Sequence, residues 1–297
     1  MTMTSQTSAS TDTITTATSG RRRLRPSRVL HYLALTAGAL LFTAPLLWMV
    51  SVSLKPTGDV FSFPPSLAPK EWVWSNYAES VGRFPFWRYL WNSVVITTLA
   101  TTGTVLSCSL VAFGFARCRF PGRRWLFAVM MATMMLPPIV LLIPTFVLFS
   151  KLGWVNTYLP LTVPAFFGTN AFCIFLLRQF YLTVPFDYDE AAYLDGASRL
   201  RVWWSIILPM SKAPLAVVAV LSVVVHWNDF LGPLVYLNDP QMRTLAVGLQ
   251  FFREQEQVQW NLLMAAATLM TLPMLLLFFG AQRYFVQGMS VSGLGGK

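Results

Sequence analysis

The chain has 297 residues, of which 55% are hydrophobic and only 11% charged, and its formal net charge is +10 at pH 7. Several apolar stretches exceed the roughly 20 residues that a helix needs to cross a bilayer, which excludes a soluble domain and predicts an all-α integral membrane protein. The basic residues stand at the ends of apolar stretches and form no continuous face. We therefore expect that this positive charge reflects the orientation of the chain in a lipid bilayer and does not bind nucleic acid.

Residues 1–28 begin with a segment of mostly Ser, Thr and Ala, which buries too little apolar surface to offset the loss of chain entropy. We expect a disordered tail that ends in a basic segment, then a transmembrane domain over 29–290 and a C-terminal tail at 291–297. Apolar runs bounded by charge, proline and glycine predict six transmembrane helices, near residues 29–54, 89–116, 125–149, 158–182, 213–236 and 260–282.

Positive charge is distributed unevenly among the segments between these helices. Most of it precedes the first helix or lies in the gaps between helices two and three and helices four and five, as Arg21, Arg22, Arg23, Arg25, Arg28, Arg117, Arg119, Arg123, Arg124, Arg199, Arg201 and Lys212. The opposing short loops carry only Lys151, Arg243 and Arg253. Because positive charge marks the cytoplasmic side, we expect both termini and the segment 183–212 to be cytoplasmic.

The sequence lacks the patterns of an enzyme or a metal site. It has no phosphate-binding GxxxxGK[ST] loop, and its two histidines, His31 and His226, have no ligand-like neighbours. We therefore expect a non-catalytic chain that binds no metal and no cofactor. Within the fifth predicted helix, His226 and Asp229 are ionisable, which fits either a proton relay or groups that bond a neighbouring helix or face water.

The polar segment 183–212 predicts a bent pair of short helices. Pro185 ends the fourth span, and Asp187 with Glu190 is spaced like a capping box that starts the next helix. Gly196 permits a bend, after which a second helix is expected from Arg201 to Ile207 and a stop at Pro209. We expect the short side chains of three alanines to leave room for a partner to approach the helix backbone closely: Ala191, Ala192 and Ala197. An amphipathic segment on the membrane surface, anchored by Trp203 and Trp204, is the alternative.

The residue order in this segment resembles the EAA loop of the membrane subunits of ATP-binding-cassette (ABC) importers. The matching positions, with no insertion, are Glu190, Ala191, Ala192, Asp195, Gly196, Ala197, Ile206, Leu208 and Pro209. The resemblance implies a type I ABC importer permease bundle in which this loop is a coupling helix that docks on a separate ATPase subunit. ATP and magnesium would then be bound by that partner and not by this chain.

Other segments are similar to carbohydrate importers of the maltose type. These are Asn92-Ser93, Trp227-Asn228-Asp229-Phe230, Pro233-Leu234, Arg243-Thr244-Leu245 and the segment 282–288. Gly232-Pro233 predicts a break in the fifth span, and together with the resemblance this break suggests a solute pathway near Trp227, Asn228, Asp229 and Gly232. The final residues 290–297 depart from the family's usual ending, so a contact between this tail and the ATPase is in doubt.

The resemblance implies three protein partners in a bacterial cytoplasmic membrane: a second six-span permease subunit, an ABC ATPase dimer and an extracytoplasmic solute-binding protein. Two alternatives remain open. The same machinery could import another solute, such as an amino acid, a phosphate ester or an osmolyte. A stand-alone proton-coupled carrier or membrane enzyme is the other alternative.

Overall fold

The computed structural model describes residues 26–254 and 257–293. Within these ranges the chain forms helices and irregular segments and no strand, which confirms the predicted all-α fold. Among the described residues, four helices are long and apolar enough to cross a membrane, or up to six when each of two bent pairs counts as one span. The predicted disordered segment and the end of the C-terminal tail, residues 1–25 and 294–297, lie outside the described residues.

The chain divides into two units, residues 1–47 and 48–297. In the first unit, the only described element is the N-terminal part of α1 (Pro26–Ser53), a helix that contains Pro45. Over residues 31–47 its apolar side chains are exposed, including Leu33, Leu41 and Phe42. A helix with exposed apolar side chains suits a lipid environment or a further helix and not water.

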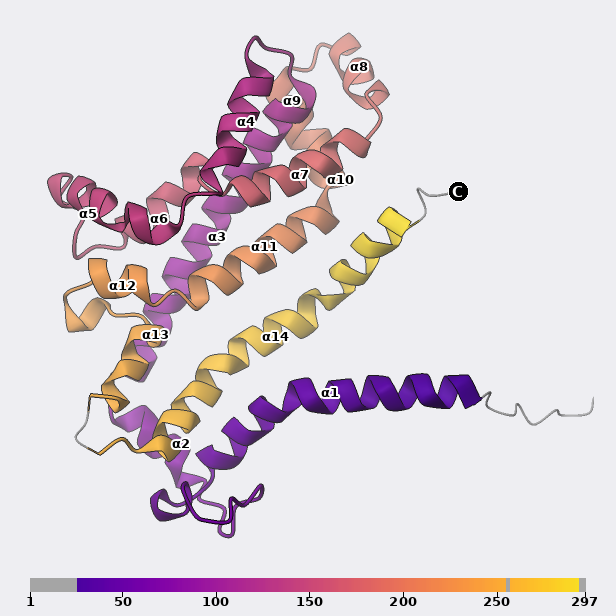
Figure 1. Ribbon diagram of the computed structural model, residues 1–297. Helices are drawn as coiled ribbons and strands as arrows, with labels where there is room; N and C mark the ends of the chain where they lie inside the picture. Colours follow the sequence, from indigo (N-terminus) through magenta and orange to yellow (C-terminus); the bar gives the residue numbers. More distant parts are fainter. Residues whose placement is uncertain (1–25, 255–256, 294–297) are drawn as a thin grey trace, which may run out of the picture. The chain divides into compact units, whose positions relative to one another are not determined.

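The second unit is organised around α3 (Phe86–Arg117), which at 1.5 Å per residue is about 48 Å long. Two helices, α7 (Ala171–Thr183) and α11 (Lys212–Trp227), pack along α3 (Figure 1). The other long helix is α14 (Trp260–Gly293), which contacts α11 and α2. The shorter elements are η1 (Thr57–Asp59), α2 (Ser75–Gly82), α4 (Arg123–Thr133), η2 (Pro138–Leu141), α5 (Leu142–Lys151), α6 (Leu159–Thr162), η3 (Val163–Phe167), α8 (Asp187–Leu194), α9 (Arg199–Val202), η4 (Trp203–Ile207), α10 (Leu208–Met210), α12 (Leu231–Tyr236), η5 (Pro240–Met242), α13 (Leu245–Gly248) and η6 (Leu249–Phe252).

Two clusters of buried apolar side chains lie towards opposite ends of α3. One joins the C-terminal half of α3 to α7, α9, η4 and α11, and its buried members include Phe113, Leu177 and Ile207. The other joins the start of α3 to α13, η6 and α14, and includes Tyr89 and Phe252. Because each end of α3 has its own core, the helix connects the two ends of the unit rigidly.

The chain has two sharp bends between helices, one within the predicted span 125–149 and one where the polar segment meets the predicted span 213–236. The elements α4 and α5 meet at 95° across a break that contains Pro137, and the helical run Arg199–Met210 meets α11 at 84°. Proline lacks the backbone donor of a continued helix and its ring clashes with the preceding turn, which accounts for the first bend. Helices interrupted at membrane depth are tolerated where they are buried in protein or line a cavity.

The predicted break at Gly232-Pro233 is wrong by a few residues. α11 ends at Trp227, where the N–H of Asn228 donates to the carbonyl of Val224, and α12 starts at Leu231. The side chain of Asp229 accepts a hydrogen bond from the N–H of Gly232 at 3.1 Å, which satisfies a free donor in the first turn of α12. The break therefore lies at residues 228–230.

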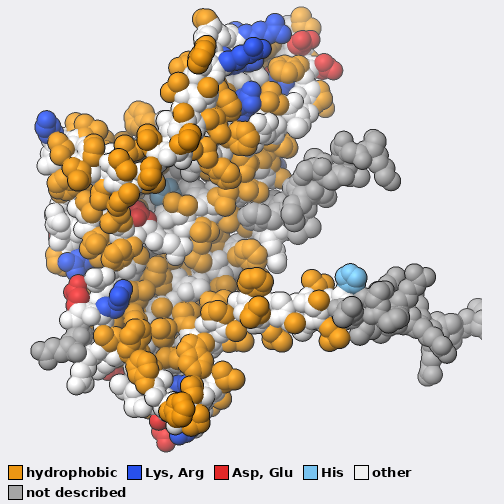
Figure 2. Space-filling view, viewed as in Figure 1, with side chains coloured by type: hydrophobic (Ala, Val, Ile, Leu, Met, Phe, Trp, Pro, Cys, Tyr) orange, Lys and Arg blue, Asp and Glu red, His pale blue; other side chains and the backbone are white. Residues whose placement is uncertain are grey.

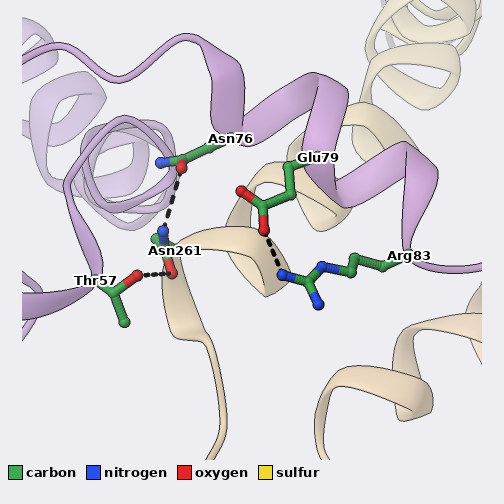
Figure 3. A network of polar contacts seen from close by, with 5 residues as sticks. All are labelled: Thr57, Asn76, Glu79, Arg83 and Asn261. Carbon is green, nitrogen blue, oxygen red and sulfur yellow. Dashed lines mark hydrogen bonds and ion pairs between the residues drawn. The ribbon is translucent and has the colours of Figure 1, made fainter.

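Two asparagines fasten the irregular segments to the helices. Asn76 donates to the carbonyls of Ser53 and Lys55, and its own carbonyl accepts from Asn261 at the start of α14 (Figure 3). Asn92 in α3 donates to the carbonyls of Gln241 and Arg243 at 2.9 Å each.

The next residue along α3 also holds this segment, because the Ser93 hydroxyl accepts from the N–H of Leu245 at 2.8 Å. Asn92 and Ser93 are thus structural ties to the segment Arg243-Thr244-Leu245.

Candidate functional site

The segment between α7 and α11 starts with α8 (Asp187–Leu194), as the sequence predicts, but the predicted capping box does not form. The N-cap position is Phe186, and no side chain caps the helix. Asp187, Asp189 and Glu190 all lie in the first turn, where negative charge interacts favourably with the helix dipole. The start of α8 therefore depends on this charge and on the break at Pro185.

The C-terminus of α8 is a Schellman motif centred on Gly196. The N–H of Gly196 donates to the carbonyl of Tyr193 at 3.0 Å, and the N–H of Ala197 donates to the carbonyl of Ala192 at 2.9 Å. Gly196 has φ of +78°, and a Cβ added to it would meet no atom within 4 Å. Glycine is required here by backbone conformation and not by crowding.

The segment α8–α10 forms a bent helical hairpin, and its second half is longer than predicted. Helical structure starts at Arg199, where Ser198 caps α9, and continues through the π-helical η4 to the end of α10 at Met210. Pro209 does not stop this run, so the predicted stop is wrong. In a regular α-helix its ring would clash with a carbonyl four residues earlier, and here that turn is the wider π-helix.

A buried ion pair joins the end of α3 to α8. The Arg117 Nη1 lies 3.6 Å from Asp189 Oδ2, and the two side chains are 0% and 3% exposed. Arg117 Nη2 also donates to the carbonyl of Val184 at 2.7 Å, and its Cζ lies 4.3 Å from the Phe186 ring centre. One arginine thus holds both the end of the fourth span and the first turn of α8.

The pair is incompletely hydrogen-bonded, since Asp189 Oδ1 and Arg117 Nε have no partner. Burial raises the pKa of the Asp189 carboxyl; Arg117 opposes this effect by lowering the pKa, and Glu190 adds to it. The cation is therefore what favours the ionised form of Asp189 in a desolvated place.

A second polar chain links the later part of the hairpin to the same helix. The Ser109 hydroxyl of α3 is 2.8 Å from the Tyr181 hydroxyl, and it accepts a hydrogen bond from Trp203 Nε1 at 2.9 Å. Ser109 is fully buried. Together with Arg117, it attaches both arms of the hairpin to α3.

The positions that match the EAA loop fall into two groups by exposure. Glu190, Ala191, Asp195, Gly196 and Pro209 are exposed, while Ala192, Ala197, Ile206 and Leu208 are partly buried. Ala192 and Ala197 pack on the core that includes α3 and α7. Their small size brings α8 close to its own bundle, whereas we predicted that it would admit a partner. Beside the exposed group, Leu194 is 89% exposed.

On the face shown in Figure 2, basic and acidic side chains gather around α8 and α9. This end also carries Arg119, Arg123 and Arg124, which line a common surface hollow. Two of the segments that the charge pattern assigned to one side of the membrane, the α3–α4 connection and the segment between α7 and α11, are therefore neighbours, as the Arg117–Asp189 pair between them also indicates.

A separate cavity of about 330 Å³ lies between α3, α5, the α6–η3 segment, α11 and α12. Its lining includes Thr104, Asn170, His226, Asp229 and Tyr236. Pro160 and Pro164, which interrupt the fourth span, line it as well. The lining combines aromatic rings with hydroxyl, amide and carboxylate groups, and it contains no lysine or arginine.

Only two of the four suggested pathway residues line this cavity. Asp229 and Gly232 do, and a Cβ on Gly232 would stand 2.5 Å from Asp229 Oδ2. Trp227 is 5% exposed, belongs to the other core and donates to the carbonyl of Met270. Asn228 is exposed and donates to the carbonyl of Val224 at the end of α11. Trp227 and Asn228 therefore shape the break, while Asp229 faces the cavity.

In residues 26–254 and 257–293, no group of three or more His, Cys, Asp and Glu side chains is placed to hold a metal ion. The roles of Arg117, Asp189 and Ser109 in holding the hairpin were not identified from the sequence. An arginine at the end of an apolar helix is ordinarily a mark of membrane topology. The one usable signal is Asp189, an acidic residue three positions before Ala192 and thus on the inward face of α8.

The chain resembles known transport proteins along most of its length. Residues 103–291 match the family described as "Binding-protein-dependent transport system inner membrane component". The probable ABC transporter permease protein YurM of Bacillus subtilis (strain 168) is 33% identical over 252 residues, which cover 85% of this chain and 83% of that protein.

Two further relatives have named solutes. The sn-glycerol-3-phosphate transport system permease protein UgpE of Brucella suis biovar 1 (strain 1330) is 32% identical, with 89% of this chain and 96% of that protein covered. The trehalose/maltose transport system permease protein MalG of Thermococcus litoralis (strain ATCC 51850 / DSM 5473 / JCM 8560 / NS-C) is also 32% identical, with 91% and 99% covered.

The fold matches as well. A chain in the crystal structure of a bacterial ABC transporter involved in the import of the acidic polysaccharide alginate superposes with a TM-score of 0.77 at 22% identity, over 87% of this chain and 96% of that one. This confirms the predicted permease fold. The sequence and fold together show that the chain belongs to the family of inner membrane components of binding-protein-dependent transport systems.

Proposed function

We propose that this chain is a non-catalytic permease subunit of an ATP-driven carbohydrate importer in a bacterial cytoplasmic membrane. It forms the pathway with a second six-span permease, receives solute from an extracytoplasmic binding protein, and couples to a cytoplasmic ABC ATPase dimer through the hairpin α8–α10. Both termini and the hairpin are cytoplasmic in this proposal, which the neighbouring basic segments Arg117–Arg124 and Arg199–Lys212 support.

The observation that carries the proposal is an exposed surface on a rigidly held hairpin. Glu190, Ala191, Leu194 and Asp195 face outwards, and Leu194 is 89% exposed. The inward side is fixed to α3 by the Arg117–Asp189 pair and the Ser109 chain. A partner that grips such a surface can move the helices behind it as a body, because packed elements shift as units.

The test uses the transporter reconstituted in liposomes with its ATPase and binding protein. Glu190→Lys combined with Leu194→Asp changes only exposed side chains, so the subunit should fold and the ATPase should detach or lose its stimulation by loaded binding protein. Leu67→Asp is the matched control, because Leu67 is 80% exposed and lies in the irregular segment between η1 and α2. Wild-type stimulation and uptake in the double variant would contradict the docking role.

The cavity supports a carbohydrate over a phosphate ester as the solute. Relatives of similar identity are permeases for sn-glycerol-3-phosphate and for trehalose/maltose. The cavity here holds Asp229, His226 and aromatic rings, and none of its lining residues is lysine or arginine. A carboxylate without a permanent cation beside it disfavours an anionic solute by charge repulsion, whereas sugars bind to carboxylates, amides and aromatic faces.

Uptake competition measures this choice directly. Binding proteins for a neutral disaccharide and for glycerol phosphate are supplied in turn to the reconstituted complex. Uptake of the phosphate ester and not of the sugar would replace the carbohydrate proposal by the alternative solute. Uptake by the purified chain alone, driven by a proton gradient without ATP, would instead support the stand-alone carrier.

A further inference from the structure

A third pocket lies near the arginine-rich end of the unit, and its lining residues belong neither to the docking surface of the hairpin nor to the cavity proposed for the solute. It has a volume of about 390 Å³ and lies between the end of α3, the start of α4 and α7. The residues that line it are three arginines and two phenylalanines: Phe115, Arg123, Arg124, Phe127 and Arg178. We propose that this pocket binds the phosphate headgroup of an anionic phospholipid.

The central residue is Arg178, which stands inside a membrane helix without a counter-charge. Its Cζ lies 4.3 Å from the Phe127 ring centre, and its Nε is buried without a hydrogen-bond partner. It lies five residues before the end of α7, a rise of about 7.5 Å. A guanidinium at such a depth is costly unless an anion or a polar group reaches it.

The surrounding charges are all positive. Arg123 repels Arg178 electrostatically, and its Nη1 is held by the carbonyl of Cys118 at 3.0 Å. Across the described part of the chain, the ion pairs are Arg83–Glu79 and Arg117–Asp189, so no carboxylate neutralises the arginines of the pocket. A phosphate is the anion whose geometry suits several guanidinium groups at once.

The start of α4 adds backbone donors to the same place. α4 begins at Arg123 after Gly122, and no side chain caps it. The first N–H groups of an uncapped helix are free and favour an anion.

The apolar surroundings favour a lipid over free phosphate. Phe115 and Phe127 pack edge to face with ring centres 5.5 Å apart and form an apolar wall of the pocket. Beyond it, Trp125, Leu126 and Val129 of α4 are 79%, 55% and 60% exposed. A headgroup in the pocket would thus have exposed apolar side chains beside it for its acyl chains. Basic pockets between membrane helices are suited to this type of ligand.

The test is native mass spectrometry of the full chain in detergent, with phosphatidylglycerol or phosphatidylcholine added at equal concentration. We expect phosphatidylglycerol to be retained preferentially. Arg178→Gln should weaken its binding by about tenfold, the loss of one charge-assisted hydrogen bond. The exposed Arg124→Gln should weaken it by a few fold and serves if the first variant does not fold. Lys151→Gln removes a distant cation and should bind lipid as the wild type does.

Three outcomes would overturn the proposal. Equal retention of both lipids, or unchanged binding by Arg178→Gln, would show that the arginines make no headgroup site. Displacement of the lipid by excess inorganic phosphate would identify a site for the free anion. In the assembled transporter, failure of a photoreactive phosphatidylglycerol to label α4 would show that a protein partner covers the pocket.

Discussion

Replacing Arg117 by alanine should release α8 from the bundle. The substitution removes the Nη2 hydrogen bond to Val184, the stacking on Phe186 and the cation opposite Asp189, whose side chain is 3% exposed. Removing one partner of a buried ion pair costs about 3–5 kcal/mol. The 3.6 Å gap and the unpaired Asp189 Oδ1 place this pair at the lower end of that range. We expect local opening of α8 to rise by about two powers of ten.

Hydrogen exchange of the α8 amides in the assembled complex measures this opening. The Arg117→Ala variant should exchange faster in α8 and keep wild-type protection in α14, which contributes to the other core. The double variant Arg117→Met with Asp189→Leu should recover most of the protection, because an apolar pair of similar volume needs no compensation for buried charge. Wild-type exchange in the single variant would refute the anchoring role of Arg117.

The same variant has a defined pH dependence. Burial raises the pKa of Asp189 and Arg117 counteracts this effect, so the carboxyl in the Arg117→Ala variant should have a higher pKa still. A folded-state pKa above the unfolded value means that stability falls as pH rises through the folded pKa. The exchange defect should therefore be smaller at acidic than at neutral pH, and a defect that grows on acidification would contradict this explanation.

Three further substitutions test other parts of the site. Gly196→Ala should destabilise the hairpin by about 1–2 kcal/mol, because a residue with a Cβ is strained at φ of +78°; Gly82→Ala, in a helix with open space around it, is the matched control in the same thermal unfolding assay. Ser109→Ala removes the partner that the buried Tyr181 hydroxyl and the partly buried Trp203 indole share, and a buried group left unpaired costs about 1–3 kcal/mol; an unchanged melting temperature would exclude this linking role. Asp229→Asn should preserve assembly and alter uptake, whereas loss of the assembled complex on size-exclusion chromatography would assign Asp229 a structural role.

The hairpin shows which features a single sequence can supply. Helix length and hydropathy predict α3, α7 and α14, because each belongs to an apolar run that is long enough to cross a membrane. Gly196 is predictable because its position after α8 requires a conformation that glycine adopts without cost. The spacing of the residues from Glu190 to Pro209 then identifies the segment as similar to an EAA loop. Each of these predictions needs only residues that are close together in the sequence.

The features that were missed or mispredicted depend on distant residues or on an unusual local turn. Asp189 pairs with Arg117 only because α8 folds back on α3, so neither residue alone indicates the ion pair. The rule for proline predicts a stop at Pro209, and the π-helical turn before it allows the helix to continue. Trp227 resembles a pathway residue by sequence, yet the carbonyl of Met270 in α14 orients it into a core.

The position of these contacts along α3 explains how one helix can serve both parts of the site. Thr104 lines the cavity between α3, α5, α11 and α12, Ser109 bonds Tyr181 and Trp203, and Arg117 holds Asp189. The rise from Thr104 to Arg117 is about 20 Å at 1.5 Å per residue, and the helix between them has no proline. A displacement of the hairpin therefore reaches the cavity through a continuous helix as well as through α11. Variants at Arg117 or Ser109 should for this reason reduce transport more than they reduce binding of the ATPase, because they replace no side chain of the exposed docking surface.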